Sequence, residues 1–219
     1  MDLKDAYNFL QFWYNKYAGS WFTPPELDAL VDKGQLSYYK KCFKKYGTGQ
    51  RLDDALAPFK KKAPFTTNST GYLSTPDDYM DLIDIVCLPS GNPVTCPVLN
   101  EDEITNRRNS QIIPNTITSP FAEEITNWNY QLYPMSLQSG ILSYFSRPIA
   151  PFYSYTTVSG RVIVYNAGLS TQLQWGDDEV EDLLLETLAS IGINLLSSEL
   201  IQWQQVKGEQ NLMGIMKPR

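Results

Sequence analysis

Histidine is absent from the 219 residues of this chain. Its absence excludes Ser-His-Asp and Cys-His catalysis and every metal site that needs an imidazole ligand. No Gly-rich run joins an expected strand to an expected helix, so the sequence also lacks a phosphate-binding loop. We therefore expect a protein that is not an enzyme and that uses no cofactor.

Cysteine is scarce, and long hydrophobic runs are missing. Cys42, Cys87 and Cys96 are too few for a disulfide framework and lack metal-ligand spacing. The start of the chain has no secretory signal pattern, and no apolar run reaches the roughly 18 residues of a membrane span. We expect no membrane segment and reduced thiols in a cytoplasm, although Cys87 and Cys96 flank a turn-forming segment, which leaves open whether they are bonded.

Acidic residues are the remaining catalytic candidates. Asp77, Asp78, Asp81 and Asp84 could together hold a divalent ion, as in a metal-dependent nuclease. The alternative is structural, because Asp77 and Asp78 follow Pro76 at the entrance to an expected strand, where turn residues are common. With no supporting base or metal motif, we favour the structural interpretation and predict no metal site.

Charge is divided along the chain, which carries a net charge of -6. Residues 1–62 hold 11 Lys and Arg against 7 Asp and Glu, whereas residues 63–219 hold 7 against 17. Within the basic part, Lys40, Lys41, Lys44 and Lys45 recur on one surface of an expected helix. These lysines are candidates to face DNA or an acidic neighbouring subunit, and the alternative is an ordinary solvated helix face.

Two helices are predicted at the start of the chain. Apolar residues at helical spacing run from Leu3 to Tyr17, and Gly19 follows. Thr23 and Glu26 form a capping-box pattern for a second helix that continues toward Tyr46, with Gly47 placed to end it. Residues 49–65 are interpreted as an exposed connector.

Short β-rich segments follow, separated by Pro, Gly and Asn, a pattern typical of an antiparallel β-region. A short helix is expected at 101–109, and Ser159-Gly160 is a candidate hairpin turn. The candidate strands are 79–88, 94–99, 130–133, 140–145, 155–158 and 161–165.

The end of the chain is predicted to be helical again. The acidic residues from Asp177 favour a helix start, Gly192 ends that helix, and Ser197 or Ser198 can cap a second one through Gln204. The fold class is therefore α+β, with the N- and C-terminal helices forming one helical body around a central antiparallel β-rich region. We treat the chain as a single unit with sub-regions 1–62, 63–175, 176–207 and 208–219.

Residues 208–219 form an apolar, glycine-interrupted terminal segment. We expect it to be a C-terminal arm that binds a larger assembly, and the alternative is an end that folds back on its own domain. Its candidate binding residues are Leu212, Met213, Ile215 and Met216.

Several short segments, spread from near one end of the chain to near the other, point to a family. They are YNFLQF at 7–12, FTPPEL at 22–27, QLSYY at 35–39, LSTPDDY at 73–79, SRP at 146–148, LQW at 173–175, IGINL at 191–195 and ELIQ at 199–202. With these segments the chain resembles structural proteins of crAss-like phages and related phages of Bacteroidetes. Its order of helices, β-region and closing helices is also similar to the tail-tubular adaptors of short-tailed phages, an architectural analogy.

The resemblance implies a head-to-tail connector of the virion, assembled in the cytoplasm of the bacterial host. Its copies would form a homo-oligomeric ring, expected to be a dodecamer, docked on the portal protein, stacked on other tail ring proteins and surrounding the DNA channel. Packaged DNA would lie close without specific contacts. The alternatives are a ring or tail protein lower in the same stack, a carbohydrate-binding tail module with exposed aromatic platforms, and a metal-dependent nuclease.

Overall fold

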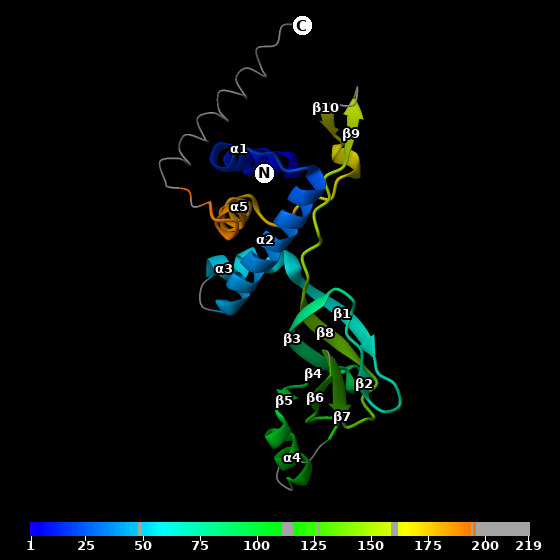
Figure 1. Ribbon diagram of the computed structural model, residues 1–219. Coiled ribbons are helices and arrows are strands. Elements are labelled where there is room, and N and C mark those ends of the chain that lie inside the picture. The colour runs from blue at the N-terminus through cyan, green and yellow to red at the C-terminus, as the bar shows by residue number, and fades with distance from the viewer. Residues whose placement is uncertain (48–49, 111–115, 127, 159–161, 194, 196–219) are drawn as a thin grey trace. The chain divides into compact units, whose positions relative to one another are not determined.

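The computed structural model describes residues 1–47, 50–110, 116–126, 128–158, 162–193 and 195 (Figure 1). The fold is α+β, as the sequence predicts. The chain forms two compact units, where the sequence was interpreted as one. Unit 1 combines residues 1–56 with residues 148–219, and unit 2 consists of residues 57–147.

Unit 1 is built on the predicted helices α1 (Leu3–Ala18), α2 (Pro24–Lys44) and α5 (Asp177–Ser190). Local signals set their ends. The Asp2 side chain accepts a hydrogen bond from the Asp5 N–H, and Gly19 ends α1 with φ at 64°. The Glu26 carboxylate accepts from the Thr23 N–H at 2.7 Å, which completes the predicted start of α2.

The three helices share one apolar core, because α5 packs on both α1 and α2. Leu10, Trp13, Val31 and Leu184 are all fully buried. Gly34 allows a close approach of α2 to α5, since a Cβ at this position would lie 1.9 Å from Thr187 Oγ1. The predicted helical body is therefore confirmed for α1, α2 and α5, whereas the second C-terminal helix (197–204) and the C-terminal arm (208–219) lie outside the described residues.

Unit 2 holds two four-stranded sheets. The first has the order β1 (Lys60–Thr66), β8 (Ser139–Ser146), β3 (Tyr79–Cys87) and β4 (Val94–Thr95). The second has the order β2 (Tyr72–Leu73), β7 (Asn129–Tyr133), β6 (Phe121–Thr126) and β5 (Val98–Leu99). The pairing is antiparallel throughout except between β5 and β6. Buried residues from both sheets, among them Phe65, Ile85, Leu132 and Leu142, form one core.

The structure corrects the connector predicted at 49–65. This segment contains helix α3 (Gln50–Ala55), the short 3-10 helix η1 (Ala57–Phe59) and most of β1. Strand β1 pairs along its whole length with β8, and this tertiary pairing overrides the low strand preference of three lysines and a proline. The predicted strand at 94–99 is two short strands separated at Cys96-Pro97, while helix α4 (Glu101–Asn109) has the predicted bounds.

Strands β9 (Tyr155–Val158) and β10 (Val162–Tyr165) form a third, two-stranded sheet. They belong to unit 1 and not to the β-region in which the sequence placed them (Figure 1). An isolated bridge between Phe152 and Thr171 and the short 3-10 helix η3 (Ala167–Leu169) extend the strand pair. We call residues 152–171 the neutral hairpin. The predicted turn at Ser159-Gly160 lies outside the described residues.

All three cysteines are free and buried. Cys87 and Cys96 lie together in the core of unit 2, where contact with Cys87 and burial raise the pKa of the Cys96 thiol. Both thiols are free in this structure, a point that the sequence left open. No helix in the described part of the chain is long and apolar enough to cross a membrane.

Candidate interaction surfaces

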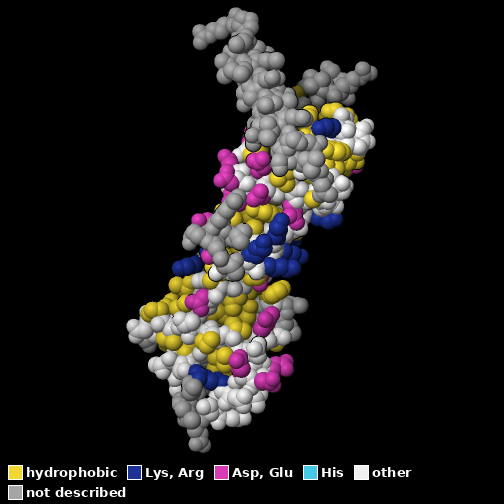
Figure 2. Space-filling model, turned by 90° about the vertical axis from the view of Figure 1, so that its left-hand side faces the viewer, with side chains coloured by type: hydrophobic (Ala, Val, Ile, Leu, Met, Phe, Trp, Pro, Cys, Tyr) yellow, Lys and Arg dark blue, Asp and Glu magenta, His cyan; other side chains and the backbone are white. Residues whose placement is uncertain are grey.

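The predicted lysines form one surface, here called the lysine strip (Lys40, Lys41, Lys44 and Lys45). All four side chains are exposed on the last turns of α2 and line one groove of about 360 Å³ with Ser37 and Glu186. Figure 2 shows one face of the molecule, with exposed Lys and Arg side chains in dark blue and acidic side chains in magenta. The four lysines thus share one groove, and what they face stays a prediction.

The lysine strip lies beside acidic residues of α5. Lys41 Nζ is 2.6 Å from Glu186 Oε2, and this hydrogen bond raises the pKa of Lys41. An adjoining cavity of about 430 Å³ is lined by Lys41, Lys45, Asp182 and Glu186 together with apolar side chains such as Leu185. A surface that combines charges of both signs with apolar side chains suits a protein partner better than a polyanion, which the two carboxylates would repel.

Asp78, one of the four acidic residues considered as nuclease candidates, has a structural role. The Asp78 carboxylate is 2.6 Å from Lys61 Nζ and accepts a hydrogen bond of 2.9 Å from the Tyr144 hydroxyl. The hydrogen bond from Lys61 is the main cause that lowers the pKa of Asp78, while burial and Asp78 raise the pKa of Tyr144 to about 12. Among the described residues, no three Cys, Asp or Glu side chains are grouped so that they could hold a metal ion.

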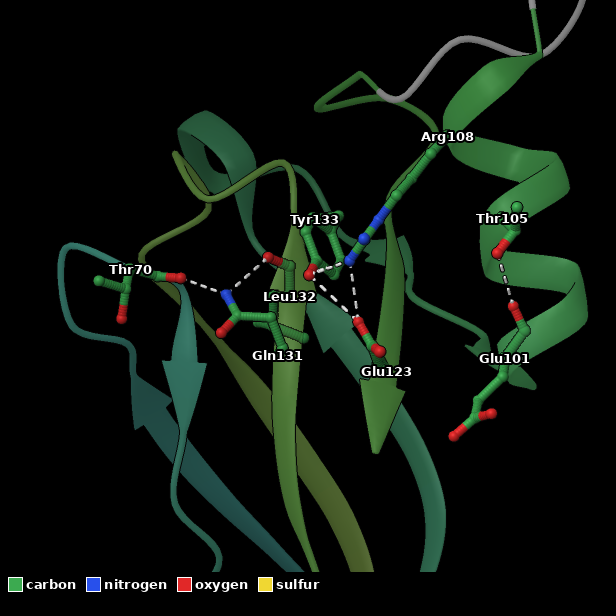
Figure 3. A network of polar contacts seen from close by, with 8 residues as sticks. All are labelled: Thr70, Glu101, Thr105, Arg108, Glu123, Gln131, Leu132 and Tyr133. Atoms are coloured by element: carbon green, nitrogen blue, oxygen red, sulfur yellow. Dashed lines mark hydrogen bonds and ion pairs between the residues drawn. The ribbon is translucent and has the colours of Figure 1, made fainter. Parts of the chain in front are cut away.

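A polar network fastens α4 to the second sheet of unit 2 (Figure 3). Arg108 of α4 reaches the Glu123 carboxylate of β6 at 3.0 Å and donates to the Tyr133 hydroxyl of β7. The Tyr133 hydroxyl itself donates to Glu123 at 3.1 Å, and burial, followed by Glu123, raises its pKa. Beside it, Gln131 donates to the Thr70 carbonyl oxygen. These groups satisfy one another, so the network holds the fold together and offers no reactive group.

Exposed aromatic rings are the feature that a carbohydrate-binding module would need. Trp128 lies at the turn between β6 and β7 with φ at 67° and is 51% exposed. Its nearest ring partner is Tyr79, at a centroid distance of 5.9 Å. The two rings are inclined by 47° and do not form one flat platform, but Trp21, which is 70% exposed, also presents a ring to solvent, so the carbohydrate-binding alternative stays a prediction.

The neutral hairpin is the surface that the sequence interpretation missed. Leu169 is 69% exposed, Ile163 51% and Val164 45%, and Phe152 and Tyr155 are exposed as well. The sequence did contain a signal, because residues 148–176 hold a single charged residue, Arg161, although 19% of the whole chain is charged. Depletion of charge combined with exposed aromatic and aliphatic side chains is typical of the centre of a protein interface.

Tyrosines anchor the base of the neutral hairpin to the helices of unit 1. The Tyr153 ring stacks on Tyr7 of α1 at 4.6 Å and contacts Tyr165 of β10 at 4.6 Å. Asp28 of α2 accepts a hydrogen bond from the Tyr153 N–H at 2.9 Å and another from the Tyr7 hydroxyl. Burial and the Asp28 hydrogen bond raise the pKa of Tyr7. The base of the hairpin is therefore fixed, while its strands are exposed.

Leu212, Met213, Ile215 and Met216, the candidate residues of the C-terminal arm, lie outside the described residues, and their role stays a prediction. Compared with known proteins, the chain matches no family model and no curated protein.

Proposed function

We propose that this chain is a structural virion protein of a bacteriophage, one subunit of a homo-oligomeric ring that joins the portal to the tail. The observation that carries the proposal is that unit 1 has two different exposed surfaces, the neutral hairpin and the lysine strip. A head-to-tail repeated contact needs two different patches on every copy, and a closing rotation produces a ring. The resemblance to phage structural proteins supports the location of that ring between the portal and the tail.

The net negative charge of the chain suits the lining of a channel through which DNA moves. With a net charge of -6, most of the surface would repel the phosphate backbone, which allows DNA to pass through the channel without tight binding. The lysine strip would then face an acidic surface of a neighbouring subunit or of another ring, and the C-terminal arm would contact the portal protein or the next tail ring protein.

Electron cryomicroscopy of the virion tests the proposed function directly. The map is expected to contain a ring of this chain between portal and tail, with DNA in its channel. Density for the chain at the capsid surface or at the tail tip, or its absence from purified virions, would contradict the proposal.

The role of the lysine strip can be tested separately by changing Lys40, Lys41, Lys44 and Lys45 to Gln. We expect weaker assembly, with the largest loss at low salt, because exposed charge pairs are screened as ionic strength rises. The matched control changes the exposed Lys4, Lys16, Lys33 and Arg147 to Gln, which alters the net charge equally and leaves the lysines of β1 in place. Equal assembly of both variants at every salt concentration, measured by mass photometry, would leave the lysine strip as a solvated face.

A further inference from the structure

The outer strands of the two sheets in unit 2 are protected against pairing with another chain. Strand β1 exposes Lys60, Lys61, Lys62 and Pro64, and the other outer strands, β2, β4 and β5, have two residues each. Lysines, proline and short length are the means by which natural proteins block the addition of a foreign strand. Each edge of these sheets carries one of them.

The neutral hairpin has none of this protection. Strands β9 (YTTV) and β10 (VIVY) have four residues each and contain neither a charged residue nor proline. Within the part of the chain that the structure describes, they pair only with each other, so each strand has one open edge. An open edge of uncharged, β-favouring residues is a template for strand addition.

Both faces of the hairpin are also exposed to solvent. Ile163 and Val164 are neighbours in β10 and point to opposite faces, yet about half of each side chain is exposed. Their cross-strand partners Thr157 and Thr156 are also exposed. A two-stranded sheet alone is marginally stable in water, so further pairing and burial would stabilise this one.

The chemistry of the hairpin narrows the choice of partner. A nucleic acid would need cations, and the segment contains only Arg161. A membrane surface would need one apolar and one polar face, whereas here apolar side chains occupy both faces. What remains is a protein strand with few charges, and the chain itself supplies one. Because β9 and β10 are antiparallel, a second copy shifted sideways in the plane of the sheet would place its β10 antiparallel to the open edge of β9 in the first copy. The two strands that meet are of equal length.

We propose that the open edge of β9 in one copy pairs with the open edge of β10 in the next copy, so that the neutral hairpins build a continuous antiparallel sheet across the oligomer. This inference rests on the proposed function, since it names the contact that repeats around the ring. Closure of the ring removes every open edge, which a two-fold pairing of β10 with β10 does not do.

The first test places charge on the hairpin of the full-length chain. Ile163→Lys combined with Val164→Lys changes two exposed residues, and Ile125→Lys, at an exposed position of β6 in unit 2, is the matched control. Circular dichroism checks that the variants fold, and mass photometry follows assembly. We expect the double variant to need about tenfold more protein to assemble than wild type, and the control to behave as wild type.

The second test determines which edges meet. Thr156→Cys on β9 and Ile163→Cys on β10 are prepared as separate proteins, mixed, and treated with a short bismaleimide linker. Cross-linked dimers are expected in the mixture well above their level in either protein alone. Equal cross-linking of the Ile163→Cys protein alone would establish a two-fold contact and overturn the proposed edge pairing.

The outcomes separate this inference from the proposed function. Rings formed equally well by wild type and by the Ile163→Lys, Val164→Lys variant would overturn the hairpin contact and leave the ring function standing. A wild-type chain that stays monomeric at every concentration and is absent from the head-to-tail junction of the virion would overturn both.

Discussion

The neutral hairpin and the outer strands of unit 2 are both exposed β-structure, yet they differ in the charge of their exposed side chains and in the protection of their edges. Strand β1 faces solvent with three lysines, whereas β9 and β10 expose Ile163 and Val164 and carry no charge. Outer strands that must stay single are protected by charge, proline or short length. The contrast lies in the strand edges, which are protected in unit 2 and unprotected in the hairpin of unit 1, and it supports our proposal that another copy covers the hairpin.

The largest expected effect tests whether the two regions are stabilised separately. Leu184→Asp places a carboxylate in the fully buried core between α5 and the N-terminal helices and should cost about 3–5 kcal/mol. Hydrogen exchange should show loss of protection in α1, α2 and the neutral hairpin, with unit 2 retained. Ala189→Asp, on the exposed side of the same helix, is the control. Unchanged protection of residues 1–46 would contradict the shared helical core.

A second prediction contrasts the tight packing of unit 2 with the open hairpin. A Cβ at Gly140 of β8 would lie 2.3 Å from the Val86 carbonyl oxygen and 2.5 Å from Phe65 Cζ. Gly140→Ala should therefore lower the free energy of unfolding of unit 2 by about 1–3 kcal/mol, measured by denaturant titration. Gly168→Ala in η3, where the nearest atom is 3.7 Å away, should have little effect. Equal effects at both sites would mean that the two regions are packed alike.

A third prediction removes the protection from β1. Lys60→Thr, Lys62→Thr and Pro64→Thr are combined in the Ile163→Lys, Val164→Lys background, so that association through the neutral hairpin is suppressed. We expect new, weak self-association with a dissociation constant of about 1 mM, detected by sedimentation velocity at high protein concentration, because the edge of β1 becomes able to pair. Lys40→Thr with Lys44→Thr removes the same charge from a helix and should not associate. Monomeric behaviour of the β1 variant would show that charge and proline are not what separates the two regions.

The smallest effect concerns the ion pair that joins β1 to the segment before β3. Lys61 lowers the pKa of Asp78 below the ordinary value of 3.8, so the stabilisation is present above that pH and is lost as pH falls through the lowered pKa. Both side chains are partly exposed, and Asp78→Asn should cost only about 0.2–1 kcal/mol near neutral pH. The difference from wild type should shrink as the pH falls below 3.8, and Asp77→Asn, at the neighbouring exposed position, is the control for loss of a carboxylate. A constant difference would exclude this ion pair as its cause.

Helices with local end signals were predictable from the sequence. The Thr23 and Glu26 pattern located α2, and Gly192, with φ at 86°, follows α5 as expected. Strand β1 was missed because its lysines and proline favour a loop locally, and only its pairing with β8 makes it a strand.

The candidate surfaces were only partly predictable. The lysines of α2 could be placed on one surface because helical spacing fixes which residues share a face. That β9 and β10 belong to the helical unit depends on Tyr153 meeting Tyr7 and Asp28, residues distant in sequence. The lack of charge in 148–176 was visible in the sequence, but its meaning required knowing that the strand edges are open.

Hydrogen exchange on the assembled protein, compared with the Ile163→Lys, Val164→Lys variant, tests the central claim most directly. If the hairpins pair across copies, backbone amides of β9 and β10 should exchange about tenfold or more slowly in the assembly, while β1 amides are unchanged. Equally fast exchange of the β9 and β10 amides in assembled wild type and in the variant would contradict it.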